Sequence, residues 1–101
     1  MVITKSECGT ITAVLTGEID HHSARIIRTS IDRDIEMQKP KTLILDFSGV
    51  EFMDSSGIGL IMGRYKMMRD YDGRVIIKSP KPYIKKVLYL AGVNRIVKME
   101  D

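Results

Sequence analysis

The sequence predicts a single α/β domain, in which helices pack on a small mixed sheet of four to five strands. Three observations lead to this fold class. Segments rich in β-branched residues alternate with segments whose apolar residues recur at helical spacing. The 42–77 region has the pattern strand, helix, strand, which joins two parallel strands by a right-handed crossover. A chain of 101 residues has room for one core, so we expect residues 1–101 to form one domain.

The N-terminal part predicts a β-hairpin followed by a helix. Residues 2–7 and 10–19 are rich in β-branched side chains, and Cys8 and Gly9 form the turn between them. Asp20 then offers an N-cap to the next segment.

This segment, DHHSARIIRTSIDRDIEMQ, predicts an amphipathic helix that ends before Pro40. Arg28 and Asp32 stand four residues apart on its polar side, which favours an ion pair along the helix. The opposite side carries an apolar stripe made of Ala24, Ile27, Ile31 and Ile35.

The middle of the chain predicts the crossover unit itself. Residues 42–47 form a near-continuous apolar run, which is typical of a strand buried on both faces. A short connection over 48–54 leads to a helix from about 55 to 71, which Gly73 ends. Residues 75–77 then form a second buried strand.

The last part of the chain predicts one more helix and a short strand. Pro80 and Pro82 open a helix over residues 83–91, and Gly92 ends it. Residues 95–99 have the pattern of a final strand. The helix residues expected to face inward are Ile84, Val87 and Leu88.

Composition and charge exclude several classes of protein. The single cysteine, Cys8, excludes an internal disulfide framework and a Cys-rich zinc module. No apolar run is long enough for a membrane span, and the N-terminus lacks a signal-peptide pattern, so we expect a cytoplasmic protein. Residues 64–98 carry a net charge of +8 within a total of +3. That segment suits a solvated surface or an acidic partner, and no motif in it predicts nucleic-acid binding.

The candidate site lies after the first strand of the crossover, where ligands of α/β sheets bind. Asp54, Ser55 and Ser56 are three consecutive residues that each favour an N-cap. A helix needs one cap, so at least one hydroxyl is free at the positive end of the helix dipole. The alternative interpretation is an ordinary cap with redundant neighbours.

The glycines of the same helix do not form a nucleotide fingerprint. The pattern Gly57-x-Gly59-x-x-x-Gly63 begins ten residues after the end of the predicted strand, whereas the fingerprint forms the turn itself. Lys78 also stands where the fingerprint has an acidic residue for the ribose. We therefore expect these small residues to pack the helix closely against the sheet.

Other catalytic patterns are missing too. Neither Ser55 nor Ser56 lies in a Gly-x-Ser-x-Gly elbow, and no orienting group for a catalytic triad is evident. His21 and His22 are adjacent and point in different directions at a helix start, so they do not predict a metal site. We expect neither an enzyme nor a metal-binding protein.

Two segments resemble a known family, namely TGEIDHH at 16–22 and FMDSSGIGLIMGRYK at 52–66. They are similar to the anti-sigma factor antagonists of the STAS domain family, of the sporulation type. The order of the predicted elements matches that fold along the whole chain. Family members usually continue with one more helix, whereas this chain stops at Asp101, so we expect a domain without the final helix.

The resemblance implies a regulatory switch in transcription. The unmodified antagonist would bind an anti-sigma factor that is also a serine kinase, and so act on the sigma factor only indirectly. That kinase, with its own ATP, would phosphorylate Ser55 and end the binding, and a phosphatase would restore it. The chain itself would need no cofactor. The resemblance also places the following residues in the partner-binding surface: Asp20, His21, Asp54, Ser56 and Gly57.

STAS domains also occur in anion transporters and stress-signalling assemblies. A nucleotide-binding or stress-signalling scaffold module is therefore the alternative function that the resemblance leaves open.

Overall fold

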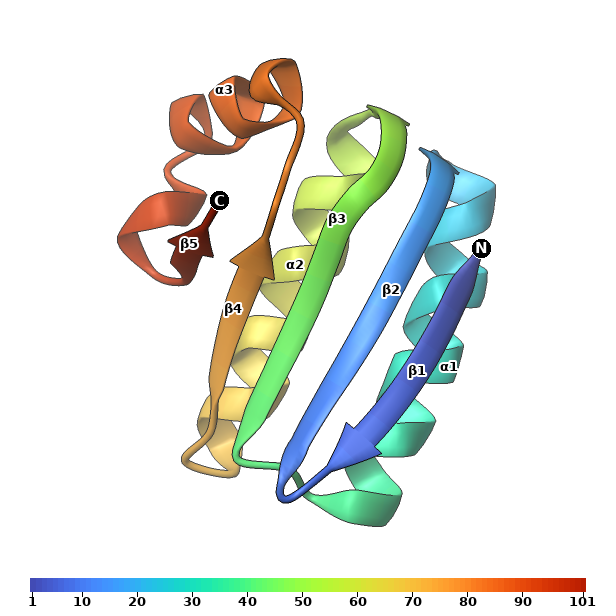
Figure 1. The fold of residues 1–101 in the computed structure, drawn as a ribbon, viewed down its shortest axis with the longest axis vertical. Coiled ribbons are helices and arrows are strands. Elements are labelled where there is room, and N and C mark those ends of the chain that lie inside the picture. Colours follow the sequence, from blue (N-terminus) through green and yellow to red (C-terminus); the bar gives the residue numbers. More distant parts are fainter.

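The computed structural model describes all residues from 1 to 101 and confirms the predicted fold class. Five strands form one mixed sheet in the order β1-β2-β3-β4-β5, in which only β1 and β2 are antiparallel (Figure 1). The elements in chain order are β1 (Val2–Glu7), β2 (Thr10–Ile19), α1 (His21–Gln38), β3 (Thr42–Met53), α2 (Ser55–Asp70), β4 (Arg74–Lys78), α3 (Pro82–Leu90), a 3-10 turn (Val93–Arg95) and β5 (Lys98–Glu100).

The hairpin turn has the geometry that its sequence predicts. Cys8 and Gly9 have φ angles of 49° and 80°, so both central residues are left-handed, as a two-residue type I′ turn requires. Glu7 pairs with Thr10 directly beside the turn, and this pairing fixes the register of the two strands.

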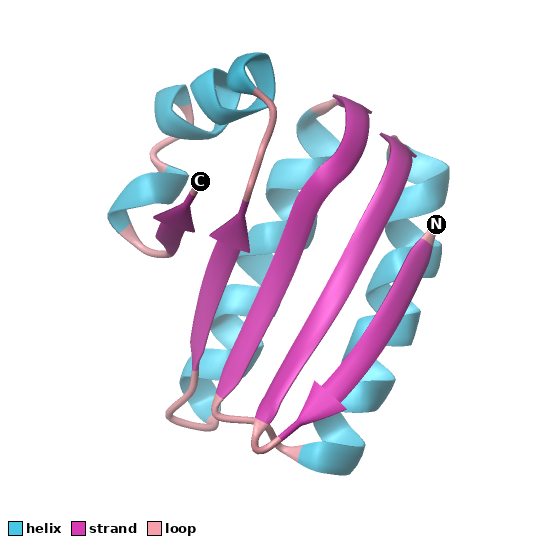
Figure 2. Cartoon of the chain, viewed as in Figure 1, coloured by secondary structure: helices cyan, strands magenta, loops and turns pink.

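The helices α1 and α2 both lie on one face of the sheet, as Figure 2 shows. Side chains of β2 and β3 therefore alternate between buried and half-buried along the first part of each strand. The prediction that residues 42–47 are buried on both faces is wrong, because Ile44 points to the face without helices and is only half-buried. β4 does match its prediction, since Val75, Ile76 and Ile77 are all buried.

Strand β3 is longer than predicted and continues through Met53. Its second half pairs with β2, although the register shifts at two places between Val14 and Glu18. These irregularities break the apolar alternation, which is why residues 48–53 do not look like a strand in the sequence. Gly49 is required here because a Cβ atom would stand 2.9 Å from Cγ2 of Thr16.

The core fills the space between the sheet and its helices. The predicted stripe of α1 is buried at Ile27, Ile31 and Ile35, while Ala24 is half-buried at the helix–helix boundary. In α3, Ile84 and Leu88 are buried and Val87 is partly buried.

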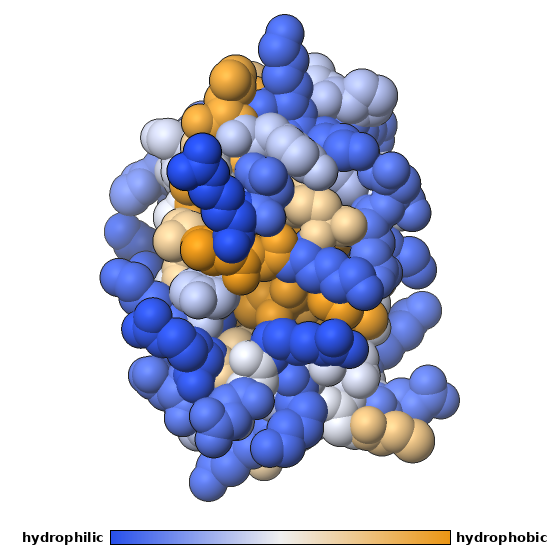
Figure 3. Space-filling view, turned by 90° about the vertical axis from the view of Figure 1, so that its left-hand side faces the viewer, coloured by the Kyte–Doolittle hydropathy of each residue, from blue (hydrophilic) through white to orange (hydrophobic).

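The C-terminal segment differs from its prediction. Residue Arg95 belongs to the 3-10 turn, and β5 begins only at Lys98. Figure 3 shows the side of the molecule where α3 and β5 lie, with apolar side chains gathered among charged ones. Leu90 and Ile96 are the large aliphatic side chains of this segment that are exposed. None of the helices has the length and apolar character needed to span a membrane.

Candidate functional site at the paired helix starts

The starts of α1 and α2 lie side by side because their preceding strands are neighbours. Ile19 at the end of β2 pairs with Met53 at the end of β3, and the backbone N–H of Asp54 donates to the carbonyl of Ile19 at 3.1 Å. Each strand is followed by one residue and then by a helix, so Asp20 and Asp54 occupy equivalent positions. The N-termini of α1 and α2 therefore lie next to each other at the carboxyl ends of β2 and β3 (Figure 1).

Asp20 caps α1 through a reciprocal pair of hydrogen bonds. Its Oδ1 accepts from the backbone N–H of Ser23 at 2.8 Å, and its own N–H donates to the Ser23 hydroxyl at 2.9 Å. The hydrogen bond from Ser23 lowers the pKa of the Asp20 carboxyl below its ordinary value, because it stabilises the ionised form.

Asp54 caps α2, and this leaves the two serines that follow it free. Asp54 Oδ1 accepts from the backbone N–H of Ser56 at 2.8 Å. Ser55 is the first residue of α2, its side chain is exposed, and its hydroxyl makes no hydrogen bond within the chain. Ser56 is half-buried, and its hydroxyl is also unused by the cap. An accessible hydroxyl thus stands at the positive end of a helix, where an anion is favoured.

Gly57 lies beneath these serines and holds the start of α2 close to β3. A Cβ atom at this position would stand 2.2 Å from Cγ of Met53 and 2.4 Å from its Sδ. Close packing thus explains Gly57 but not Gly59 or Gly63, whose missing Cβ atoms would meet nothing within 4 Å. The prediction that all three glycines serve packing is wrong for these two.

The glycines of α2 lie closer to the end of the preceding strand than the sequence predicts. Because β3 ends at Met53, the first glycine follows the strand by four residues rather than ten. Gly57 nevertheless lies within the first turn of α2 and directly on Met53, so no loop of glycines surrounds a phosphate there.

A groove of about 310 Å³ separates the N-terminal halves of the two helices. We call it the interhelical groove. From α1 and α2 respectively, it is lined by His21, Ala24, Arg25 and Arg28, and by Ser56, Gly59 and Leu60. His21 and Ser56 were candidates from the sequence, whereas Arg25 and Arg28 were not. The sequence alone does not single them out, because both lie on the charged side of an amphipathic helix.

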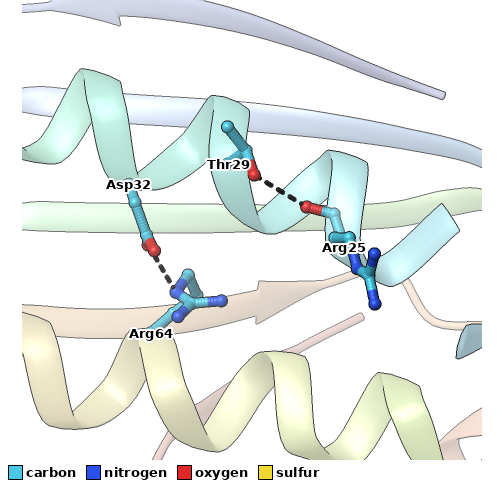
Figure 4. A network of polar contacts seen from close by, with 4 residues as sticks. All are labelled: Arg25, Thr29, Asp32 and Arg64. Carbon is cyan, nitrogen blue, oxygen red and sulfur yellow. Dashed lines mark hydrogen bonds and ion pairs between the residues drawn. The ribbon is translucent and has the colours of Figure 1, made fainter. Parts of the chain in front are cut away.

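Arg64 lies further along α2 and joins the two helices through Asp32 (Figure 4). Arg64 Nε is 2.8 Å from Asp32 Oδ1, and the arginine is only 6% exposed. Burial lowers the pKa of Arg64 while Asp32 partly offsets this effect, and burial raises the pKa of Asp32. The expected ion pair between Arg28 and Asp32 is absent, because Asp32 turns towards the buried guanidinium.

Several basic residues of the 64–98 segment have partners within the chain. Lys81 Nζ donates to the Ser48 carbonyl at 2.8 Å, and Lys85 pairs with Asp101 at 2.7 Å. The hydrogen bond with Asp101 raises the pKa of Lys85. Part of the basic charge therefore stabilises local structure. No three His, Cys, Asp or Glu side chains converge into a metal-binding group.

Comparison with known proteins identifies the family to which this fold belongs. The STAS domain model matches residues 3–101, and the chain belongs to the STAS domain family. It is 31% identical to the anti-sigma F factor antagonist of Paenibacillus polymyxa, over 92% of this chain and 80% of that protein. The identity is 38% with the protein of the same name from Lysinibacillus sphaericus, over 84% and 73% of the two chains.

Solved structures of anti-sigma factor antagonists have the same fold as this chain. The unphosphorylated form of the anti-sigma factor antagonist SpoIIAA superposes with a TM-score of 0.87 at 32% identity, over 98% of this chain and 87% of that one. The phosphorylated form of the Bacillus SpoIIAA superposes with a TM-score of 0.78 at the same identity, over 98% and 90%.

Proposed function

We propose that this protein is an anti-sigma factor antagonist whose binding is switched off by phosphorylation of Ser55. The names of its relatives support the antagonist role, and one relative with 32% identity has been solved in a phosphorylated form. The single observation that carries the site is the exposed Ser55 hydroxyl, which no hydrogen bond of the helix cap occupies.

The partner we propose is an anti-sigma factor with serine kinase activity. It supplies the ATP, transfers the γ-phosphoryl group to Ser55 Oγ and releases ADP, so the antagonist acts as a substrate and not as an enzyme. A phosphatase reverses the modification. The sigma factor is affected only because the antagonist binds the anti-sigma factor and displaces the sigma factor that it holds.

The surface we assign to the partner surrounds Ser55 at the paired helix starts. Its members are Asp20, His21, Asp54, Ser56 and Gly57. Gly57 acts through the backbone, since it keeps the start of α2 against Met53.

A phosphate on Ser55 ends binding through charge and desolvation. It adds about −1.5 to −2 charges at the helix N-terminus, where the dipole and free N–H groups favour an anion. Asp54 opposes this stabilisation by repulsion, so the fold changes little. At the contact surface, the same dianion must lose its water, which costs on the order of several kcal/mol when the partner offers no matching cation.

The test is to map phosphate after incubating the protein with ATP and the anti-sigma factor kinase of its own organism. We expect one phosphate on the wild type and on Ser56→Ala, and none on Ser55→Ala. Mass spectrometry of peptides identifies the modified residue. Phosphate on Ser56, or ATP hydrolysis by the antagonist alone, contradicts the proposal.

A further inference from the structure

The interhelical groove carries positive charge that the chain does not neutralise. Arg25 and Arg28 line it, and neither takes part in an ion pair. No acidic side chain of α1 lies three or four residues from Arg25, so the helix offers this arginine no ion pair. The nearby Thr29 donates its hydroxyl to the backbone carbonyl of Arg25 at 3.0 Å (Figure 4). The one acid within this distance of Arg28 is Asp32, and it pairs with Arg64.

A third guanidinium lies behind the groove and adds to the positive potential. Arg64 is buried between the helices, and its Nη1 has no hydrogen-bond partner. Burial lowers the pKa of Arg64, and repulsion from the positive charge of Arg28 lowers it further. The carboxylate of Asp32 thus interacts with both Arg64 and Arg28, while Arg25 has no acidic partner. Like charges three residues apart destabilise a helix by about a few tenths of a kcal/mol. Helix stability therefore does not explain why two arginines stand at positions 25 and 28.

The groove is open on the side of the candidate serine. Gly59 lines it without a side chain, and nothing stands within 4 Å of its missing Cβ. Ser55 is four residues before Gly59, so it lies on the same stripe of α2, one turn or about 5.4 Å nearer to the helix start. His21 and Ser55 are the first residues of two helices that follow paired strand ends, so they lie at the same level.

We propose that the interhelical groove receives the phosphoryl group carried by Ser55 itself. Arg25 and Arg28 bind its oxygens, and His21 stands beside it at the rim. A phosphate dianion matches two guanidiniums in charge, and the planar fork of arginine fits its oxygens in pairs. This inference rests on the proposed function, since it assigns the place of the modification that Ser55 receives.

Arg25 and Arg28, which together we call the clamp, must overcome two carboxylates at the same end of the sheet. Asp54 and Asp20 both face the region of Ser55, and each accepts a hydrogen bond from its own helix at 2.8 Å. Their repulsion raises the second pKa of the phosphoserine, while Arg25 and Arg28 lower it. If the clamp holds the phosphate, the cations have the larger effect on the second pKa of the phosphoserine.

The experiment installs phosphoserine at position 55 during translation through an expanded genetic code, so that no kinase is needed. A ³¹P NMR titration then gives the second pKa of the phosphate in the wild type, in Arg25→Gln/Arg28→Gln and in a control. The control, Arg33→Gln/Arg95→Gln, removes the same charge from exposed positions outside the groove.

We expect the second pKa to be higher in the groove variant than in the wild type by about half a unit or more, and unchanged in the control. Equal titration in the wild type and the groove variant, or an equal shift in the control, overturns the clamp. As a second measurement, phosphoserine should raise the melting temperature of the wild type more than that of the groove variant. An equal effect in both also overturns it.

The two proposals fail in different ways. If the kinase does not modify Ser55, the proposed function is wrong, while the titration of the installed phosphoserine still decides whether the groove receives it. If the kinase modifies Ser55 and the titration shows no clamp, the switch stands and only this inference is lost.

Discussion

Arg64 Nε lies 2.8 Å from Asp32 Oδ1, and this ion pair joins α2 to α1. The arginine side chain is 8% exposed and the aspartate side chain 29% exposed, so water screens the pair only in part. Removing the carboxylate leaves a buried guanidinium without a counter-charge. We therefore expect Asp32→Asn to lower the free energy of unfolding by about 2–3 kcal/mol in urea denaturation.

Arg64→Met is the informative comparison, because it removes the buried charge and keeps an apolar side chain of similar length. We expect Arg64→Met to lower the free energy of unfolding by less than Asp32→Asn does. Arg33→Gln, on the exposed side of α1, serves as the surface control and should change stability by about 0.5 kcal/mol or less. Equal small losses for Asp32→Asn and Arg33→Gln are the result that rules out a buried pair.

Gly57 and Gly59 give a matched pair of substitutions on the same helix. Gly57→Ala brings a Cβ within 2.2 Å of Met53 Cγ, and that side chain is buried, so we expect a loss of about 1–3 kcal/mol. Gly59→Ala meets no neighbour, and alanine favours a helix over glycine, so we expect a gain of about 0.5–1 kcal/mol. Thermal or urea unfolding measures both. A loss at Gly59 would show that α2 tolerates no side chain beside the groove.

The pH dependence of stability follows from the cap of α1. The hydrogen bond from Ser23 lowers the pKa of Asp20 in the folded protein, so the native state binds fewer protons there than the unfolded chain does. The resulting stabilisation is complete above the unfolded pKa of 3.8 and is lost as the pH falls through the lower folded pKa. We expect the stability difference between the wild type and Asp20→Asn to be constant near neutral pH and to close in acid.

Urea unfolding at a series of pH values measures this difference. Glu36→Gln, an exposed substitution on the same helix, controls for the loss of one negative charge. A difference that widens as the pH falls would contradict the role of the ionised Asp20 in the cap.

The hairpin turn predicts a stabilising substitution. Cys8 is exposed and has a φ of 49°, a left-handed conformation that asparagine adopts more readily than other residues with a side chain. Cys8→Asn creates the Asn-Gly pair that type I′ turns prefer, and we expect a gain of about 0.5 kcal/mol. Cys8→Val is the opposite control, because a β-branched residue at this φ is strained. Urea midpoints that do not separate the two variants would contradict the argument.

The local features were predictable from the sequence, whereas the tertiary ones were not. The Cys8-Gly9 turn and the cap at Asp20 depend on neighbours in the chain, and the structure has them where the sequence predicts them. The second half of β3 depends on its pairing with β2, which the pattern of residues 48–53 does not reveal. The spacing in the sequence pairs Asp32 with Arg28, and only the packing of α1 on α2 brings Arg64 closer.

The same distinction applies to the candidate site. Ser55 could be selected from the sequence because three consecutive cap-forming residues exceed what one helix needs. Arg25 and Arg28 could not, since they resemble the polar side of any amphipathic helix. They stand out only in the folded protein, where α2 leaves a groove beside them that Gly59 lines without a side chain.

The variant Ser55→Asp separates a switch at the contact surface from a switch by unfolding. Ser55→Asp places a negative charge on an exposed side chain at the start of α2, where the helix dipole favours it and Asp54 opposes it. We expect a melting temperature close to that of the wild type and an affinity for the anti-sigma factor lower by about tenfold or more.

Titration calorimetry and thermal unfolding measure the two quantities on the same samples. Ser55→Ala should bind the anti-sigma factor like the wild type, because it adds no charge and leaves the Asp54 cap intact. Ser56→Ala tests whether the effect belongs to position 55, since Ser56 lines the groove without being fully exposed. If Ser55→Asp lowers the melting temperature by many degrees, the negative charge disrupts the start of α2, and loss of binding then reports unfolding rather than repulsion at the contact surface.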